Sequence, residues 1–293
     1  MNTARAASAS RRRTRDPEAE LQVSLDPEVV QTRSGAQAMR DKLTGELMHP
    51  VGPLVESERL YVEPSRLALR LQGSGPPLVL LDVGLGAASN ALAAWRCSQT
   101  LPGERRRLRI ISLDRSLAAL ELALTPEHAG AFGLEARAGE AARELLTQGR
   151  HETPQTEWQL RLGEIEANLQ MSADDLADIV FWDPFSPRAN PELWTCAALT
   201  QVRAACRAGA TLHTYSGATA VRAALLLSGF AVGMGAKLSE GKYATIAATS
   251  VELLQQPLER RWVARLSRSS APFPPDAPDD ALERIRALAQ FAG

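Results

Sequence analysis

Apolar residues along the chain gather in short runs separated by segments with helical spacing. The first clear run, Leu78–Gly84 (LVLLDVG), is nearly continuous in apolar side chains, which is typical of a parallel strand covered on both faces. Similar strand-like runs follow at 107–114, 158–164, 177–183 and 210–216, with a terminal pair around 231–235 and 243–249. Helical spacing fills the intervals at 89–99, 116–124 and 220–230.

This alternation predicts an α/β fold, a doubly wound domain around a mainly parallel, seven-stranded sheet flanked by helices. Residues 31–75 form an entry segment with turn signals, in which the alternating run RLYVEP (59–64) predicts a hairpin strand. The main domain spans residues 31–256. Residues 257–293 read as a C-terminal appendage rather than a separate domain, with a last helix in DALERIRALAQF.

The amino-terminal stretch, residues 1–30, differs from the rest in composition. It carries five arginines before its first acid at Asp16, lacks the apolar centre of a secretory signal, and is expected to be a disordered basic arm. Such an arm either solvates the chain or contacts nucleic-acid phosphates. The formal net charge of the whole chain is only −1, so charge alone favours the solvating reading.

Composition narrows the classes of function. The three cysteines (Cys97, Cys196 and Cys206) have no C-x-x-C spacing and there are four histidines, so we expect no metal site and a reduced, cytoplasmic compartment. No apolar run approaches the roughly 18 residues that span a bilayer, so we expect no membrane segment.

Candidate chemistry collects at the ends of the predicted strands, where open α/β sheets bind ligands. The first strand runs into Gly84 and Gly86, which allow a tight turn and close backbone approach, although Ser89 breaks the full dinucleotide fingerprint. Asp114 ends the second strand and suits ribose hydroxyls, or else serves only as a charge at a helix N-terminus. Glu164 follows the third strand and suits an adenine amine. Together these ends predict an adenosine-containing cofactor.

The fourth predicted strand separates the two cofactor classes that remain. It ends in Asp183 and the turn DPFSP, for which a nicotinamide oxidoreductase gives no reason. Methyl transfer to nitrogen requires the acceptor amine to be held in line with the donor, and the prolines keep the Asp183 carboxylate at the pocket edge. A purely turn-forming aspartate before proline remains the alternative.

Several segments together are similar to one known family. The segments LDVGLGAASN, ISLD, LGE, FWDPFSPRANPELWT, TYSGATAVRAALLLSGF and GMGAKLSEGKYA resemble the methyltransferase part of the bacterial MnmC family, and GELMHPVGPLVESERLYV resembles its entry segment. The resemblance covers roughly residues 32–250. It implies a Rossmann-like class I S-adenosylmethionine-dependent methyltransferase that converts 5-aminomethyl(-2-thio)uridine to 5-methylaminomethyl(-2-thio)uridine at the wobble position of tRNA.

The resemblance also implies roles for individual residues. Asp183 and Tyr215 would be catalytic, and Asn190 and Trp194 would brace the turn. Our own hypothesis is that Asp183 orients the amine and receives its proton, and the alternative is that it only positions the amine. Pro184, Phe185, Ser216 and Lys237 would bind the substrate, and Ile165 the adenine. The residues expected to bind the cofactor S-adenosylmethionine are Asp82, Gly84, Gly86, Asn90, Asp114, Glu164 and Asp183.

The chain departs from the family pattern in a few places. Ala87 and Ala88 stand where a third glycine is common, and Asp114 where glutamate is common. No second Gly-rich fingerprint for an FAD-dependent oxidoreductase is present, so we expect a stand-alone methyltransferase whose substrate comes from upstream tRNA-modifying enzymes. The alternatives left open are methylation of another RNA or a small amine, a cofactor-binding relative without catalysis, and a nicotinamide oxidoreductase.

Overall fold

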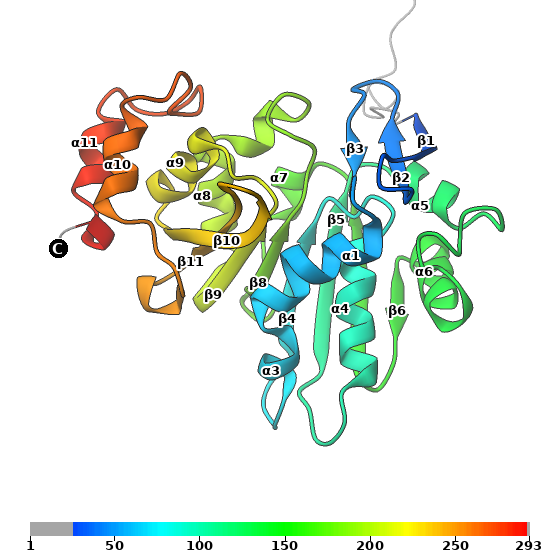
Figure 1. Ribbon diagram of the computed structural model, residues 1–293. Helices are drawn as coiled ribbons and strands as arrows, with labels where there is room; N and C mark the ends of the chain where they lie inside the picture. Colours follow the sequence, from blue (N-terminus) through cyan, green and yellow to red (C-terminus); the bar gives the residue numbers. More distant parts are fainter. Residues whose placement is uncertain (1–25, 292–293) are drawn as a thin grey trace, which may run out of the picture.

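The computed structural model describes residues 26–291 of the chain, and its centre is one large sheet (Figure 1). Its strands are β4 (Leu78–Val83), β5 (Leu108–Asp114), β6 (Arg150–Glu152), β7 (Thr156–Leu162), β8 (Ala177–Trp182), β9 (Cys206–Thr214), β10 (Ala231–Ser239) and β11 (Lys242–Ala248). They lie in the order β10-β11-β9-β8-β4-β5-β7-β6. Strands β4, β5, β7, β8 and β9 pair in parallel, which confirms the predicted α/β class.

The sheet has eight strands, not the predicted seven. The additional strand β6 is three residues long and forms the edge of the sheet, where it pairs antiparallel with β7. Its sequence, Arg-His-Glu, has no apolar run. As an edge strand that directly follows a helix, it buries little side-chain surface. The hydrophobic pattern therefore could not reveal it.

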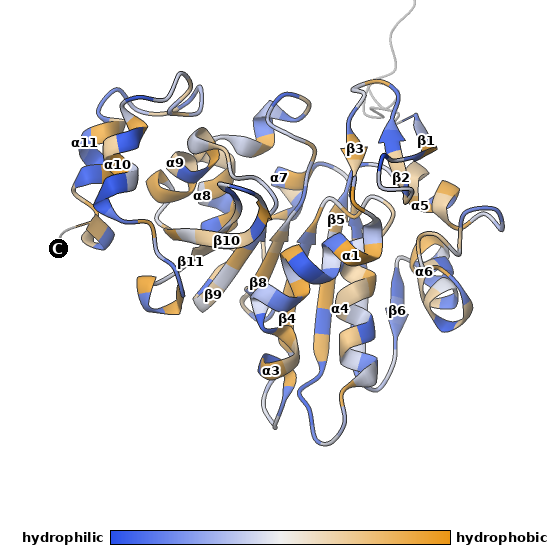
Figure 2. Ribbon diagram, in the orientation of Figure 1, coloured by the Kyte–Doolittle hydropathy of each residue, from blue (hydrophilic) through white to orange (hydrophobic). Residues whose placement is uncertain are grey.

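Helices cover both faces of the sheet and create two separate cores. One core joins Leu80, Ile110 and Phe181 to α4 (Ser89–Thr100), α5 (Ala118–Ala123) and α6 (Ala136–Gln148). The other joins the alternate residues Leu81, Val180 and their neighbours to α7 (Ile165–Asn168), α8 (Cys196–Ala204) and α9 (Thr219–Leu227). This doubly covered arrangement explains why the central strands are apolar on both faces, as the colouring of Figure 2 shows for β5 and β8.

The entry segment forms a small sheet followed by a broken helix. Its elements are β1 (Pro27–Gln31), β2 (Gln37–Asp41), β3 (Leu47–Met48), α1 (Pro53–Ser57), the π-helical turn η2 (Glu58–Val62), α2 (Glu63–Ser65) and α3 (Leu67–Leu71). The predicted hairpin strand at 59–64 is wrong. Three consecutive residues there, Leu60, Tyr61 and Val62, are buried, because η2 packs against α4 and β9. The charged residues on either side of them are exposed.

The predicted disordered arm also needs a correction at its end. Residues 27–31 pair with 37–41 in an antiparallel ladder, so order begins before residue 30. The remainder of the predicted arm, residues 1–25, lies outside the described part of the chain.

The C-terminal residues pack onto the core of the main sheet. They include α10 (Arg260–Leu266) and α11 (Ala281–Arg286). Among the described residues, short 3-10 turns lie at Ala173–Asp175, Pro191–Trp194, Val251–Leu253 and Ala289–Phe291. Trp262, Ile285 and Phe291 are buried in the core beneath α9. Figure 1 shows α10 and α11 at the far end of the molecule from β1–β3.

Candidate active site

The order of the strands reverses between β4 and β8, and the two strand ends are joined there by backbone contacts. The chain runs from β4 outward through β5 and β7, then returns to place β8 and β9 on the other side of β4. The amide of Asp183 donates to the Val83 carbonyl at 2.9 Å. Such a switch point is where doubly wound folds bind ligands.

Gly84 is required at this junction. Its φ is +88°, and a Cβ built on it would lie 2.6 Å from the Asp183 carbonyl oxygen. Any larger residue would push the loop after β4 away from the turn after β8. The glycine in the predicted cofactor loop therefore serves close packing between two strand ends as well as a tight turn.

A cavity of about 610 Å³ opens above these strand ends. Its floor is the Gly84–Gly86 loop and the turn from Asp183 to Ser186, and its cover comes from the entry segment between Asp41 and Tyr61. The cavity has the size of a typical small-molecule site. Nine residues predicted from the sequence line it: Gly84, Gly86, Asp114, Ile165, Asp183, Pro184, Phe185, Asn190 and Tyr215.

Asp183 lies at the bottom of this cavity and is held by two donors. The Tyr61 hydroxyl donates to Oδ1 at 2.5 Å, and the Asn90 side-chain amide donates to Oδ2 at 2.6 Å. Burial raises the pKa of Asp183 to about 7, although both hydrogen bonds act to lower it. A carboxylate with a pKa near neutrality suits a group that accepts a proton during turnover.

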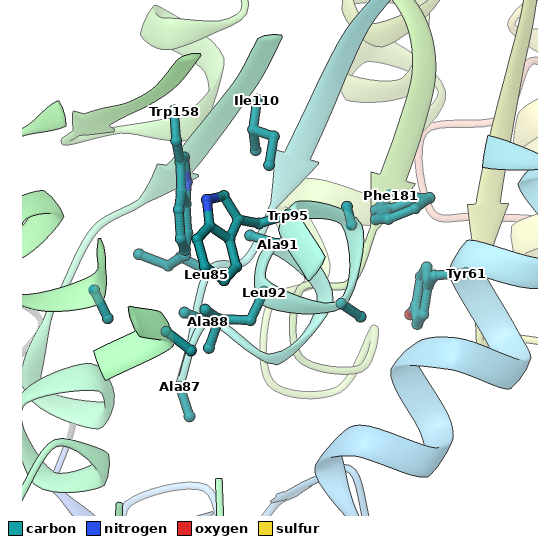
Figure 3. Packing of buried hydrophobic residues seen from close by; sticks show 14 of the residues in the cluster. Tyr61, Leu85, Ala87, Ala88, Ala91, Leu92, Trp95, Ile110, Trp158 and Phe181 are labelled. Carbon is teal, nitrogen blue, oxygen red and sulfur yellow. The ribbon is translucent and has the colours of Figure 1, made fainter. Parts of the chain in front are cut away.

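Tyr61 is the main site residue that the sequence did not reveal. It is 1% exposed, lies on η2, and its ring centroid is 5.3 Å from that of Phe181 on β8 (Figure 3). Burial raises the pKa of Tyr61, and the neighbouring Asp183 carboxylate raises it further, so the hydroxyl stays a donor. The sequence around Tyr61 resembled a strand, and nothing in it indicated a contact with Asp183, which lies 122 positions further along the chain.

The floor beneath the glycine loop contains buried polar atoms without a partner in the described residues. Oδ1 of Asp82, Oγ of Ser89 and Oδ1 of Asn90 are all of this kind. The other Asp82 oxygen accepts from Ser112 Oγ at 2.7 Å, and burial raises the pKa of Asp82 to about 7. Buried polar groups are normally paired, and none of these three residues lines the cavity, so the unpartnered atoms lie beneath its floor. Contact of Asp82 and Asn90 with the methionine moiety of the cofactor stays a prediction.

Asp114 has a structural role at the glycine loop and the following helical segment, and its ribose role stays a prediction. Its Oδ2 accepts from the Gly86 amide at 2.9 Å, while Oδ1 accepts from the amides of Arg115 and Ser116. The carboxylate thus fixes the glycine loop and the start of the next helical segment while its side chain lines the cavity. Free lone pairs on both oxygens leave it able to accept from ribose hydroxyls.

The wall on the side of β8 and β9 is fixed by contacts among its own residues. The Tyr215 hydroxyl donates to the Pro184 carbonyl at 3.1 Å, and Trp194 Nε1 donates to the Phe185 carbonyl at 2.7 Å. Glu46, from the entry segment, accepts from the Ser186 amide at 2.8 Å and from its hydroxyl. The proline-rich turn is therefore held from three sides, and the Asn190 backbone amide closes it by donating to Ser186.

Other predicted residues lie close to the cavity without lining it. Glu164 is half-exposed at the start of α7 and lies 3.7 Å from Arg115. Ser216 is buried and uses its carbonyl to accept from Thr245. Lys237 is exposed at the rim, where its carbonyl accepts from Arg59 while the adjacent Leu238 reaches the cavity.

Within residues 26–291, no group of three or more histidine, cysteine, aspartate or glutamate side chains is arranged to hold a metal ion. None of the helices in this part of the chain is long and apolar enough to cross a membrane.

The chain is similar to S-adenosylmethionine-dependent methyltransferases. Residues 139–250 match a family model described as an S-adenosyl-L-methionine-dependent methyltransferase. Of the two cofactor classes that the strand ends left open, this match favours S-adenosylmethionine over a nicotinamide.

The particular relatives are proteins called tRNA 5-methylaminomethyl-2-thiouridine biosynthesis bifunctional protein MnmC. That of Methylibium petroleiphilum is 28% identical over 75% of this chain and 34% of its own length. That of Paracidovorax citrulli is 35% identical over 52% of this chain and 25% of its own length. A solved structure, MnmC2 from Aquifex aeolicus, is 25% identical with a TM-score of 0.70, covering 90% of this chain and 83% of that one. The resemblance to the methyltransferase part of MnmC is confirmed, and the chain spans about a third or less of the length of these curated relatives.

Proposed function

We propose that the protein transfers a methyl group from S-adenosylmethionine to the aminomethyl nitrogen of 5-aminomethyl(-2-thio)uridine at the tRNA wobble position. The observation that carries this proposal is the Asp183 carboxylate, fixed beside the glycine loop at the junction of β4 and β8. The relatives named for biosynthesis of this nucleoside support the choice of acceptor.

The cofactor supplies an electrophilic methyl group on a sulfonium, and the protein must hold a neutral amine in line with it. Asp183 is placed to accept a hydrogen bond from that amine and then its proton. A permanently charged carboxylate would favour the unreactive ammonium form. The pKa of Asp183, raised by burial to about 7, reduces this conflict because the acid can hold the proton at neutral pH.

The residues at the entrance favour a large substrate over a small amine. Eight large apolar side chains are exposed in the described part of the chain, and five of them line this cavity. They are 40% to 67% exposed, and are Leu43, Leu47, Val51, Val55 and Leu238. Apolar surface around a polar pocket marks a contact site for something that stays outside it. Unstacked bases next to a target nucleotide have the faces to cover such a rim.

Arg188 is a basic residue placed to contact tRNA, whereas two arginine-rich segments, 104–109 and 260–268, lie away from the cavity. Arg188 lines the cavity in the proline-rich turn. The segment 104–109 leads into the amino end of β5, which is the opposite edge of the sheet, and α10 lies at the far end of the molecule (Figure 1). We therefore expect the phosphates next to the target uridine to lie near Arg188, with Lys237 on the opposite rim.

The test is methyl transfer from labelled S-adenosylmethionine to tRNA isolated from cells that accumulate the aminomethyl precursor. We expect one methyl group per wobble uridine, identified as methylaminomethyl-uridine by nucleoside mass spectrometry. The matched control is the same tRNA with an unmodified wobble uridine, which should accept nothing. Label on the unmodified tRNA, or on free amines but not on tRNA, would move the assignment to one of the other acceptors.

A further inference from the structure

Tyr61 belongs to a wide turn in the middle of the entry helix. The turn, η2, joins α1 to α2 without a break, and the Glu63 amide donates to the Glu58 carbonyl, five residues earlier. Such π-helical turns are rare, and where they interrupt an α-helix they frequently mark a functional site. The turn buries Tyr61, which is 1% exposed, and its hydroxyl reaches the end of β8. The entry segment thus brings a tyrosine from the cover of the cavity to its floor.

The Tyr61 hydroxyl is one of three anchors that hold Asp183 from three different elements. It donates from η2 to Oδ1 at 2.5 Å, and the Asn90 side-chain amide donates from α4 to Oδ2 at 2.6 Å. The Asp183 backbone amide donates to the Val83 carbonyl at the end of β4. Asn90 alone would leave the carboxylate free to rotate, whereas donors on both oxygens fix its orientation. Each oxygen keeps a second lone pair for a substrate amine.

The ring of Tyr61 is held independently of its hydroxyl. Its centroid lies 5.3 Å from that of Phe181 on β8 (Figure 3). Arg59, on the same turn, donates to the Lys237 carbonyl and so ties η2 to β10. Removal of the hydroxyl alone leaves both contacts in place. A phenylalanine at position 61 therefore tests the hydrogen bond without unpacking the turn.

Other ionisable groups face Asp183 from the elements around it, but within residues 26–291 none of them donates a hydrogen bond to its carboxylate. His49, in the cover, lies 3.7 Å from Oδ2, and burial lowers the pKa of its imidazole, which keeps the ring neutral. The others are Tyr215, which donates to a backbone carbonyl, and the acids Asp82 and Glu56, which accept hydrogen bonds elsewhere. The hydroxyl from η2 is thus the ionisable group that contacts this carboxylate directly.

We propose that Tyr61 is a positioning residue for methyl transfer, whose hydroxyl holds the Asp183 carboxylate in the orientation that receives the proton of the aminomethyl nitrogen. The inference rests on the proposed function. An ammonium substrate R–CH₂–NH₃⁺ gives one proton to Asp183, its nitrogen bonds to the methyl carbon, and the carbon–sulfur electron pair stays on sulfur. The products are R–CH₂–NH₂⁺–CH₃, the thioether and one H⁺, which Asp183 releases before the next turnover. Tyr61 keeps its own proton throughout, because burial and the Asp183 carboxylate raise its pKa.

The first test is turnover by the Tyr61→Phe variant. We expect kcat to fall about tenfold, the lower end of the effect of one hydrogen bond to a charged group, with S-adenosylhomocysteine affinity unchanged. Tyr243→Phe is the matched control, because it removes a hydroxyl from β11 at a residue that does not line the cavity, and its kcat should equal that of wild type. A Tyr61→Phe variant as fast as wild type would overturn the proposal.

The second test does not depend on the substrate. Carbon-13 NMR of the whole protein, labelled at its aspartate carboxyl groups, follows Asp183 over pH, with the signal assigned from Asp183→Asn. We expect a wild-type midpoint near pH 7 and a higher midpoint in Tyr61→Phe, because the lost donor favoured the charged carboxylate. Tyr243→Phe should leave the midpoint unchanged.

The outcomes of the two tests separate this role from the proposed function. An Asp183 midpoint that is the same in Tyr61→Phe and wild type would overturn the positioning role, even if wild type methylates tRNA. A lower Tm in Tyr61→Phe without a shifted midpoint would do the same, since the hydroxyl would then serve the fold alone. A shifted midpoint in a protein whose wild type methylates no tRNA would support the hold of Tyr61 on Asp183 and count against the proposed substrate.

Discussion

The two halves of the cavity floor differ in how far their polar groups are satisfied. On the side of β4, the oxygens Asp82 Oδ1, Ser89 Oγ and Asn90 Oδ1 are buried without partners in the described residues. On the side of β8, Asp183, Ser186, and the carbonyls of Pro184 and Phe185 all have hydrogen-bond partners in the protein. We expect a ligand to complete the first half, whereas the protein itself already holds the second.

This contrast suggests different contributions to the reaction. Unpartnered atoms on the cofactor side contribute affinity, because they gain hydrogen bonds only when the cofactor is bound. Fixed atoms on the acceptor side contribute rate, because they hold the amine where the methyl group will be. Substitutions on the two sides should therefore separate binding from turnover.

The largest effect is expected on the acceptor side, from Asp183→Asn. The amide still accepts from Asn90 and can donate to the Tyr61 oxygen, so the geometry is kept while the proton acceptor is lost. We expect kcat to fall about 10²- to 10⁴-fold, with S-adenosylhomocysteine affinity changed little. Single-turnover methyl transfer and calorimetry measure the two quantities. Near-normal turnover would leave Asp183 only the role of aiming the amine.

The same variant tests the raised pKa of Asp183. Because the folded-state pKa is above its unfolded value, the protonated acid stabilises the fold below about pH 4, and this contribution is lost as pH rises through about 7. The asparagine carries no charge to desolvate. We expect thermal unfolding of Asp183→Asn to show a higher Tm than wild type at pH 8, with the difference shrinking towards pH 5. An equal difference at both pH values would contradict the assignment.

Gly84→Ala should disturb both halves at once. The added Cβ would meet the Asp183 carbonyl at 2.6 Å, and the residue has a positive φ, so strain of about 1–3 kcal/mol is expected. That corresponds to about a 10- to 100-fold loss in catalytic efficiency when the strain is relieved by moving the loop. Gly149→Ala is the control, because its φ is also positive but nothing lies within 4 Å of its Cβ. Equal effects of the two would show that conformation alone, and not contact, matters at Gly84.

Asp82→Asn should affect the cofactor side alone. Loss of the charge near the methionine amine should weaken S-adenosylmethionine binding about tenfold, in line with one charged hydrogen bond. The rate at saturating cofactor should stay close to that of wild type, which a comparison of KM and kcat will show. Ser112→Ala serves as the control, since it removes the neighbouring hydroxyl and leaves the charge. A drop in kcat with unchanged affinity would reverse the division of labour between the two halves.

The smallest effect is expected from Glu46→Gln. Its carboxylate accepts from both the amide and the hydroxyl of Ser186, whereas a glutamine oxygen can accept from only one of them without rotating its amide. We expect about a threefold fall in kcat and no change in cofactor affinity, because only the hold on the acceptor turn is loosened. If affinity fell instead, the entry segment would belong to the cofactor side.

The sequence predicted the main strands and the residues at their ends because these obey local rules. Apolar runs marked β4, β5, β8 and β9, and Gly84, Asp114 and Asp183 stood where parallel strands place ligand groups. The entry segment was misread at 59–64 because the three buried residues in a row, Leu60 to Val62, do not show helical spacing. Tyr61 reaches Asp183 by a contact between distant segments, which no local pattern contains.

The direct junction between the ends of β4 and β8 has a consequence for the order of events. Gly84 packs against the Asp183 carbonyl with no room for a side chain, and the Asp183 amide is bonded to Val83. A shift of the glycine loop as the cofactor enters must therefore move the peptide that carries Asp183. Kinetically, this favours a compulsory sequence in which the methyl donor binds first and the acceptor second, with the acceptor pocket reset each time the spent donor departs.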